Sequence, residues 1–475
     1  MSVWNPAFGP LLSAQKLQGA HRVAMLGIGG VGMYGLACLL QQRGVTVIGQ
    51  DLVEGTYTRA LLQRGAEIQI GPNIPEPLLE TADCLIYSTA LPQDHTNLKQ
   101  AKLESIPCLS RSDALAGAMV GGGRQIAVSG THGKSTATTM LSHIYREAGR
   151  DPTVLCGAEA VGEDSPLLIG RDGFVYEACE YMGSFWSFRP DVALVLGAEQ
   201  DHVDCYPTEE SYLAAYGRFV AGAERIAVYG GDQKAVRVCL ESGREVQSYA
   251  LEESSADLHG YGLERFGSGY RYGVRWRGQD LGTFFLPLAG QFNVENALGA
   301  TLVALMDGIS PEPIRRALAK ERGVKRRLEQ VGTLGGASVY EDYAHHPTEM
   351  AASLGALRTH TAGRLYCVFQ SHTYTRTAAY LREIGQALCL ADRAWVLPIY
   401  PARETDTLGM SHKVIAHAAD SSCVTAESSA DQVWAQLEQH MRPGDTAVLM
   451  GAGSIHDLFA PFIAKLGQNR EYPLL

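Results

Sequence analysis

The sequence lacks several features that would mark other classes of protein. Its ten cysteines include no Cys-x-x-Cys pair, which argues against a zinc cage or a dithiol motif and is typical of free thiols in a reducing compartment. No apolar run is long enough to span a bilayer. Residues 1–20 show no basic region followed by an apolar stretch, as a secretory signal would. We therefore expect a cytoplasmic protein without membrane insertion.

Positive charge is also scarce. The chain has 40 Lys and Arg against 51 Asp and Glu, a net charge of −11, and no long basic run. A nucleic acid is therefore an unexpected partner. A local anion site remains compatible with this charge, because a few backbone amides and one lysine suffice to hold a phosphate. Nothing in the sequence decides between a monomer and a homodimer.

The 475 residues, 46% of them hydrophobic, are enough for about three globular domains. Short apolar runs alternate with helical patterns, which predicts an α/β fold with mainly parallel sheets. Residues 270–290 alternate polar and apolar side chains and predict a hairpin. Boundaries are expected at GGGR (121–124), a plausible linker, and at GVKRRLE (323–329). The predicted domains are 1–120, 121–325 and 326–475.

The first glycine motif, GIGGVG at 27–32, follows a predicted strand, and Asp51 lies about twenty residues further on. Glycines let backbone amides approach a diphosphate at a helix N-terminus. By itself the pattern predicts a dinucleotide-dependent oxidoreductase, but the same geometry serves any diphosphate, including that of a UDP-sugar. A tight strand–helix turn with no ligand is the structural alternative.

A second motif lies between a predicted strand and a helix that we expect to start at Ser135, and it reads Gly130, Thr131, His132, Gly133, Lys134, Ser135, Thr136. Gly-Lys-Ser is typical of a phosphate-binding loop. The strict pattern would need glycine at Val128, so this loop is a variant. Lys134 can reach the terminal phosphates of ATP and Ser135 can bind Mg²⁺. The alternative is a glycine turn with a surface lysine.

Acidic and imidazole side chains follow two more predicted strands. Glu177 and Glu180 close FVYEACE, and Asp201, His202 and Asp204 follow VALVLGAE. Ligands of open parallel sheets bind beyond the carboxyl ends of the strands. Oxygen and imidazole groups there can complete a magnesium shell. Taken singly, each residue is more often a cap or a loop ion pair.

Four further clusters are rich in polar groups. Asn293 and Asn296 are spaced i, i+3 and share a helix face, with helix capping by Asn293 as a compatible alternative. The basic run 325–327 can be a solvated hinge or an anion clamp. Residues 342–349 and 370–377 each follow a predicted strand, and two such loops in one domain predict a ligand-binding edge.

These motifs, in this order, resemble those of the Mur ligase family over nearly the whole chain. GIGGVGM, STALPQDH and IPCLSRSDALA are most similar to the branch that adds L-alanine to UDP-N-acetylmuramate, and NVEN, GVKRRLE, EDYAHHPTE and FQSHTYTRT also have counterparts. The resemblance implies a Rossmann-like UDP-sugar domain, a P-loop ATPase-like central domain and a Rossmann-like C-terminal domain for the amino acid and ATP. It implies an ATP-dependent ligase of peptidoglycan synthesis, hence of cell-wall biogenesis, cell shape and cell division. Its substrates would be UDP-N-acetylmuramate, L-alanine and ATP, joined through an acyl phosphate with two Mg²⁺ ions.

The resemblance also implies roles for individual residues. UDP-sugar contacts are expected from Gly29, Gly30, Val31, Gly32, Asp51, Ser88 and Thr89. ATP contacts are expected from Gly130, Thr131, His132, Gly133, Lys134, Ser135, Thr136, Asn293, Asn296, Arg327 and Asp342. Metal ligands are expected at Ser135, Glu177 and His202, and catalytic roles at Lys134, Glu177, His202, Arg327, His345, His372 and Arg376. A Lys134→Ala variant is expected to lose ligation and keep its fold.

The sequence departs from the family pattern at three positions. Phe292 stands where the family usually has histidine, and Cys179 and Met182 replace carboxylates. In several members a carbamylated lysine soon after the Asp-His loop holds the second Mg²⁺. Here no lysine lies between Asp204 and Lys234, and the alanine-adding branch resembles this absence. The second ion would then depend on His202, phosphate oxygens and water.

Three other functions are weighed against this one. An NAD(P)-dependent oxidoreductase would leave the phosphate loop and the strand-end carboxylates unexplained. A recycling ligase that attaches a tripeptide to the same sugar is a nearer alternative, although GIGGVGM fits the alanine branch better. A non-catalytic UDP-sugar sensor is expected to have lost Lys134 or Glu177, and both are present.

Overall fold

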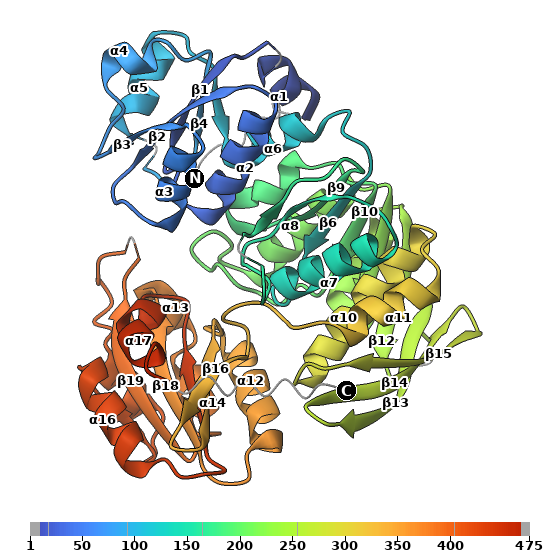
Figure 1. Cartoon of the computed structure of the whole chain (residues 1–475), viewed down its shortest axis with the longest axis vertical. Coiled ribbons are helices and arrows are strands. Elements are labelled where there is room, and N and C mark those ends of the chain that lie inside the picture. The colour runs from blue at the N-terminus through green and yellow to red at the C-terminus, as the bar shows by residue number, and fades with distance from the viewer. Residues whose placement is uncertain are drawn as a thin grey trace. The chain divides into compact units, whose positions relative to one another are not determined.

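The computed structural model describes residues 10–17, 19–92, 94–163, 165–253, 255–402 and 404–466. The prediction of no secretory signal concerns residues 1–20, of which residues 1–9 and 18 lie outside these ranges. The described chain forms three sheet-based α/β regions (Figure 1), so the expected fold class is confirmed. It divides into two compact units, the first with residues up to 199, 210–249 and 299–314, and the second with 200–209, 250–298 and 315 onward.

The first sheet has five parallel strands in the order β3-β2-β1-β4-β5. Its strands are β1 (Arg22–Leu26), β2 (Thr46–Asp51), β3 (Glu67–Ile70), β4 (Cys84–Tyr87) and β5 (Cys108–Ser110). Its helices are α1 (Pro10–Leu17), α2 (Val31–Gln42), α3 (Thr56–Gln63), α4 (Glu76–Leu79), α5 (Thr96–Leu103) and α6 (Arg111–Met119). The strand order reverses between β1 and β4, and ligands of such sheets bind at that point.

The second sheet contains the strands β12-β11-β10-β6-β9-β7-β8 in this order. Neighbouring strands from β12 to β7 pair in parallel. The strands are β6 (Gln125–Ser129), β7 (Thr153–Leu155), β8 (Leu167–Leu168), β9 (Phe174–Glu177), β10 (Val192–Val195), β11 (Arg225–Tyr229) and β12 (Glu245–Leu251). The accompanying helices are α7 (Lys134–Glu147), the 3₁₀ helix η1 (Tyr181–Ser187), α8 (Glu209–Val220), α9 (Gln233–Glu241), α10 (Gln291–Met306) and α11 (Pro311–Ala319).

The second unit contains an antiparallel meander and the third sheet. The meander is β13 (Leu258–Phe266), β14 (Gly269–Trp276) and β15 (Gln279–Leu286), which confirms the hairpin expected at 270–290. The third sheet has the order β16-β17-β21-β18-β19-β20, with only the β16–β17 pair antiparallel among its described pairings. Its strands are β16 (Glu329–Leu334), β17 (Ala337–Asp342), β18 (Leu365–His372), β19 (Arg393–Tyr400), β20 (Val424–Ala426) and β21 (Thr446–Met450).

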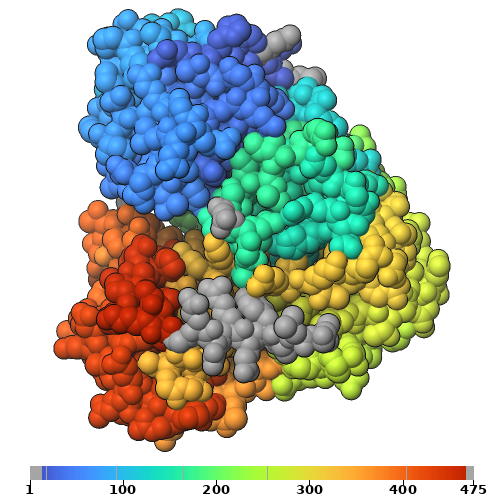
Figure 2. Space-filling model, in the orientation of Figure 1, coloured from blue at the N-terminus to red at the C-terminus, as the bar shows by residue number. Residues whose placement is uncertain are grey.

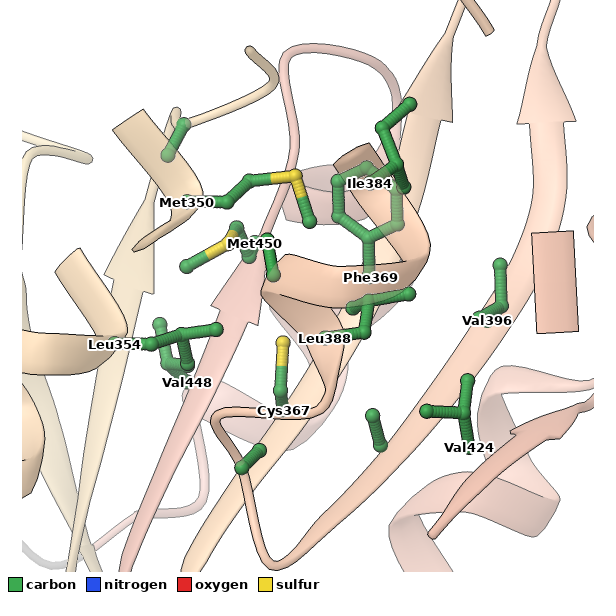
Figure 3. Packing of buried hydrophobic residues seen from close by; sticks show 14 of the residues in the cluster. Met350, Leu354, Cys367, Phe369, Ile384, Leu388, Val396, Val424, Val448 and Met450 are labelled. Atoms are coloured by element: carbon green, nitrogen blue, oxygen red, sulfur yellow. The ribbon is translucent and has the colours of Figure 1, made fainter. Parts of the chain in front are cut away.

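Helices cover the faces of the third sheet. They are α12 (Pro347–His360), α13 (Tyr374–Ala379), α14 (Leu381–Leu388), α15 (His412–Ala418), α16 (Ala430–His440) and α17 (Ile455–Ile463). Met350 and Leu354 of α12 and Ile384 and Leu388 of α14 pack with Phe369 of β18 in one buried cluster (Figure 3). The orange and red surface in Figure 2 belongs to this region. The helices thus bury apolar strands that carry polar loops at their ends.

Several local expectations needed correction. Short strands such as β3, β5, β8 and β20 were not predicted, because two to four residues at a sheet edge show no clear apolar run. The predicted linker GGGR packs on its neighbours, since a Cβ on Gly122 would lie 2.5 Å from the ring of Phe174, and its role as a domain boundary stays a prediction. Helix α7 begins at Lys134, one residue before the expected Ser135. No helix in the described ranges is both long and apolar enough to cross a membrane.

Candidate active site

The first glycine motif forms the turn between β1 and α2. Gly27 has φ 73°, a left-handed conformation that glycine adopts without strain, and Gly30 is the N-cap of α2. The N–H of Gly29 donates to Oδ2 of Asp51 at 2.7 Å, and a Cβ at Gly29 would stand 2.8 Å from that oxygen. The motif and Asp51 are therefore adjacent, as expected, but the Gly29 amide is already used inside the protein.

Ser88 and Thr89 follow β4, the neighbour of β1. Ser88 Cβ lies 3.2 Å from where a Cβ of Gly27 would be, and both residues are half-buried. The N–H groups of Val31 and Gly32, in the first turn of α2, donate to no described residue. These amides point out of the positive end of a helix dipole, as an anion site requires.

The second motif forms the turn between β6 and α7. Gly130 has φ 145° and Gly133, the N-cap of α7, has φ 79°. Thr131 Oγ1 donates to the carbonyl of Glu199 at 2.6 Å, and the His132 ring lies 2.8 Å from the Glu199 carboxylate. The loop is thereby tied to the segment that follows β10, and its two positive φ angles are conformations that glycine adopts without strain.

Lys134 is the first residue of α7 and forms a buried ion pair. Its Nζ lies 3.1 and 3.2 Å from the two carboxylate oxygens of Glu180, a residue only 1% exposed, and also donates to the carbonyl of Gly130 at 2.5 Å. Burial alone would lower the pKa of Lys134, but the charge of Glu180 raises it above its usual range. The lysine is therefore charged and held at the loop.

Ser135 and Glu177 supply oxygens beside the loop. Oε1 of Glu177 accepts the N–H of Gly157 at 2.6 Å and the thiol of Cys156 at 3.2 Å. Oε2 of Glu177 accepts no hydrogen bond from the described residues, and neither does the buried Ser135 hydroxyl. An uncommitted carboxylate oxygen and a hydroxyl are hard ligands of the kind that Mg²⁺ prefers.

A second charged cluster lies in the second unit. Arg376 donates through Nε and Nη2 to the Asp201 carboxylate at 3.0–3.3 Å, and through Nη1 to Nδ1 of His372 at 3.1 Å. Burial alone would raise the pKa of Asp201, but the charge of Arg376 lowers it below its usual range. His202, next in the chain, has φ 53°. Because Arg376 only donates, Nδ1 of His372 is an acceptor and its proton is on Nε2.

His345 and its neighbour His346 have different roles. Burial lowers the pKa of His345 to about 3, so its ring is neutral at neutral pH. Nδ1 of His345 lies 3.0 Å from the carbonyl of Tyr343, which fixes the proton on Nδ1 and leaves Nε2 as an acceptor. His346 is the N-cap of α12 and accepts the N–H of Thr348, which is a structural role.

The basic run at 325–327 is no freely solvated hinge. Arg326 and Arg327 lie 5.1 and 4.7 Å from the centre of the Tyr343 ring, and Arg327 is 3.9 Å from Glu349. Asp342, at the end of β17, is 5% exposed, and burial raises its pKa to about 6. Its Oδ2 is buried and accepts no hydrogen bond from the described residues, so it can take a hydroxyl donor.

Asn293 and Asn296 are both buried on α10. The helix begins at Gln291, so Asn293 is not its N-cap, and capping is the wrong interpretation. The Asn293 side chain instead donates to the carbonyl of Ala289 at 2.7 Å. Phe292, which replaces the family histidine, lies against Gly290, where a Cβ would meet the ring at 2.4 Å.

Several candidate-site residues have backbone conformations that side chains rarely adopt. Positive φ angles of 47–66° occur at Met182, His202, Arg326, Leu328 and Thr373. Each costs about 1–3 kcal/mol and persists only where the surrounding structure enforces it. Nothing in the sequence signals this strain, since none of the five is glycine or asparagine.

Two residues beside the candidate site were not predicted from the sequence. Arg111 opens α6 and lies against Gly32, and only its place in IPCLSRSDALA could have signalled it. Glu404 accepts the N–H groups of Tyr374 and Thr375 at 2.7 and 2.9 Å and so holds the loop that carries Arg376. Its signal in the sequence is weak, an isolated acid in a long loop.

A glycine-rich turn with a buried lysine joins a parallel strand to a helix, and further α/β regions precede and follow it in the chain; this organisation is typical of nucleotide-binding α/β proteins. Three domain models of one family match the chain in order. They are "Mur ligase family, catalytic domain" at residues 22–121, "Mur ligase middle domain" at 128–304, and "Mur ligase, glutamate ligase domain" at 326–453.

Full-length relatives agree with these models. The chain is 37% identical to a UDP-N-acetylmuramate–L-alanine ligase of Streptomyces avermitilis over 94% of this chain and 98% of the relative. It is 38% identical to the ligase of the same name from Mycobacterium sp. (strain JLS), over 95% and 97%. The crystal structure of the UDP-N-acetylmuramate–alanine ligase of Thermotoga maritima shares the fold, with a TM-score of 0.79, 21% identity, and coverage of 94% and 98%.

The chain therefore belongs to the Mur ligase family, whose members use ATP as a co-substrate. It is an ATP-dependent ligase.

Proposed function

We propose that this protein joins L-alanine to the carboxylate of UDP-N-acetylmuramate, with conversion of ATP to ADP and phosphate, in the synthesis of peptidoglycan precursors. The observation that carries the proposal is the similarity over nearly the whole chain, at 37–38% identity, to relatives named for this reaction. The geometry supports it with two anion-binding turns, one at α2 and one at α7. Their separate use for a UDP-sugar and for ATP accounts for both glycine motifs.

The domain roles follow from the same proposal. Residues 1–120 would bind the UDP-sugar, 121–325 ATP, and 326–475 the amino acid together with part of ATP. The ranges of the three matched domain models, 22–121, 128–304 and 326–453, support these boundaries. The ten free thiols support a reducing compartment, and we therefore place the reaction in the cytoplasm.

The chemistry has two steps. A carboxylate does not react with an amine in water, because oxide is a poor leaving group. The carboxylate oxygen first attacks the γ-phosphorus of ATP, and ADP leaves. The nitrogen of alanine then attacks the carbonyl carbon of the acyl phosphate, loses a proton, and phosphate leaves with the bonding pair. The first step needs positioning and neutralised charge rather than a protein nucleophile, which fits the absence of a nucleophile–base pair among the assigned residues.

The residues assigned to ATP have the properties that this step requires. The charge of Lys134 is secured by Glu180, and the lysine would share it with the terminal phosphates of ATP. Arg327 would supply a second positive charge, and Asn293 and Asn296 would meet the adenine. The unsatisfied Oδ2 of Asp342 would accept a ribose hydroxyl. His345, His372 and Arg376 would face the amino acid.

Magnesium would be held by Ser135 and Glu177, with His202 at a second ion. The uncommitted Oε2 of Glu177 and the Ser135 hydroxyl fit such an ion. Bound Mg²⁺ supplies positive charge to the phosphate oxygens of ATP. Because the lysine that carries a carbamate elsewhere in the family is missing after Asp204, the second ion would take phosphate oxygens and water beside His202.

The proposal is tested by phosphate release from ATP, with each candidate sugar and amino acid added singly and in pairs. We expect turnover only with UDP-N-acetylmuramate and L-alanine together. Turnover with the tripeptide and not with L-alanine would identify a recycling ligase. NADH binding with no response to UDP-N-acetylmuramate would favour the oxidoreductase.

A further inference from the structure

Arg111 lies over the glycine motif of the first sheet. It is the first residue of α6, directly after β5, and its side chain crosses to the first turn of α2. A Cβ placed on Gly32 would stand 3.1 Å from Cδ of Arg111 and 3.3 Å from both Nε and Nη1. Glycine at position 32 therefore leaves room for a guanidinium beside the N-terminal amides of α2.

This guanidinium is not satisfied by the protein. Arg111 is partly buried, and it makes no hydrogen bond with any residue in the described ranges. Burial lowers its pKa, and the nearby carboxylate of Glu177 acts in the opposite direction. Arginine stays charged under such shifts. None of its nitrogens is among the fully buried atoms that lack a partner, so the guanidinium reaches the surface and can donate to an anionic ligand.

Hydrogen bonds hold the start of α6 and so fix the backbone from which the Arg111 side chain extends. Ser110, the N-cap, accepts the N–H of Asp113 at 3.2 Å and donates its hydroxyl to Oδ2 of Asp113 at 2.7 Å. Oδ1 of Asp113 accepts the hydroxyl of Ser187 at 2.8 Å, which ties α6 to η1. The planar fork of an arginine matches two phosphate oxygens.

We propose that Arg111 binds the diphosphate of the UDP-sugar across the N-terminus of α2, together with the amides of Val31 and Gly32. The proposal rests on the proposed function for the identity of the sugar nucleotide. Without Arg111, the groups assigned to the diphosphate would be uncharged: the amides of Val31 and Gly32 and the hydroxyls of Ser88 and Thr89. The amide of Gly29 already donates to Asp51. The alternative is that Arg111 only balances the charge of Glu177 and touches no substrate.

The experiment measures binding of UDP to the full-length protein by calorimetry, and KM for UDP-N-acetylmuramate and for ATP by phosphate release. The variants are Arg111→Ala and Arg111→Lys. The matched control is Arg59→Ala, an exposed arginine of the same domain paired only at 3.5 Å with Glu54. Charge-assisted hydrogen bonds of this kind predict a loss of UDP affinity of about tenfold to hundredfold in Arg111→Ala.

We expect KM for the sugar nucleotide to rise with the UDP dissociation constant, KM for ATP to stay within about twofold, and Arg111→Lys to lose less than Arg111→Ala. Arg59→Ala should match the wild type. Wild-type UDP affinity in a folded Arg111→Ala variant, or a change confined to the magnesium requirement, would overturn the proposal. Failure of the wild type to release phosphate with both substrates would instead reject the proposed function.

Gly32→Ala provides a second route in case Arg111→Ala does not fold. The added Cβ would press on the arginine at 3.1–3.3 Å, so UDP binding should weaken although the guanidinium is still present. KM for ATP should stay within about twofold of the wild type, because the added Cβ lies in the first turn of α2. Wild-type UDP affinity in a folded Gly32→Ala variant would overturn the proposal.

Discussion

Lys134 is expected to stabilise the buried carboxylate of Glu180 and to supply positive charge to the phosphoryl group, so a substitution of Lys134 affects both stability and activity. Its Nζ pairs with Glu180, which is 1% exposed, at 3.1 Å, so Lys134→Ala leaves a buried carboxylate without its counter-ion. Breaking one side of a buried pair costs about 3–5 kcal/mol. The expectation from sequence that this variant keeps its fold unchanged is therefore revised. We expect its unfolding free energy to fall by that amount.

Activity should fall for a separate reason. Losing one preorganised positive group at a transferring phosphoryl costs about 3–4 kcal/mol of transition-state stabilisation, which is a factor of several hundred in kcat. The two losses are separated by Lys134→Met combined with Glu180→Gln. Replacing both charges by groups of similar volume is often neutral for stability, so the double variant should recover most of the unfolding free energy and remain inactive.

The measurements are urea denaturation followed by far-UV circular dichroism, and phosphate release under single-turnover conditions. Lys234→Ala, at an exposed position in α9, is the control and should stay within about 0.5 kcal/mol of the wild type with full activity. A single Lys134→Ala variant as stable as the wild type would refute the reasoning about the buried pair. So would a double variant no more stable than the single one. Substantial turnover in a folded variant would reject the assignment of the phosphate loop.

Three further predictions concern the other charged groups. His202→Ala should lose most activity and regain part of it at raised Mg²⁺. The wild type should need no bicarbonate, so rescue of its activity by bicarbonate in carbon-dioxide-depleted buffer would contradict this account. Burial raises the pKa of Asp342 to about 6. Between about pH 4 and 6 the folded chain therefore holds a proton that the unfolded chain has released. The unfolding free energy falls by about 2–3 kcal/mol as pH rises through that window. Asp342→Asn should lose this component in urea titrations at pH 4.5, 6 and 7.5, and an unchanged slope would count against it. Asp201→Asn weakens the buried pair with Arg376 and should lower the unfolding free energy by about 3 kcal/mol; an unshifted denaturation midpoint would argue against the pair.

The sequence determined the features whose causes are local. Apolar runs gave the central strands of all three sheets, because a strand buried on both faces needs an uninterrupted apolar segment. The glycine turns at 27–32 and 130–133 were also predictable, since their positive φ angles at Gly27, Gly130 and Gly133 are conformations that glycine adopts at little cost. The polar residues at strand ends followed from the rule that parallel strands present their carboxyl ends at one edge.

Only the tertiary structure decided which of these polar groups meet. Asp201 and Arg376 are 175 positions apart and form a buried pair, and Glu180 reaches Lys134 from 46 positions away. No sequence motif links Arg111 to Gly32, yet the folded chain places the Arg111 side chain, and its positive charge, beside the first turn of α2. The roles of the assigned site residues stay predictions, because their ligands set those roles. Pairing between distant charges depends on the packing of whole sheets and on the cost of burying an unpaired ion, and neither is encoded in a short window of sequence.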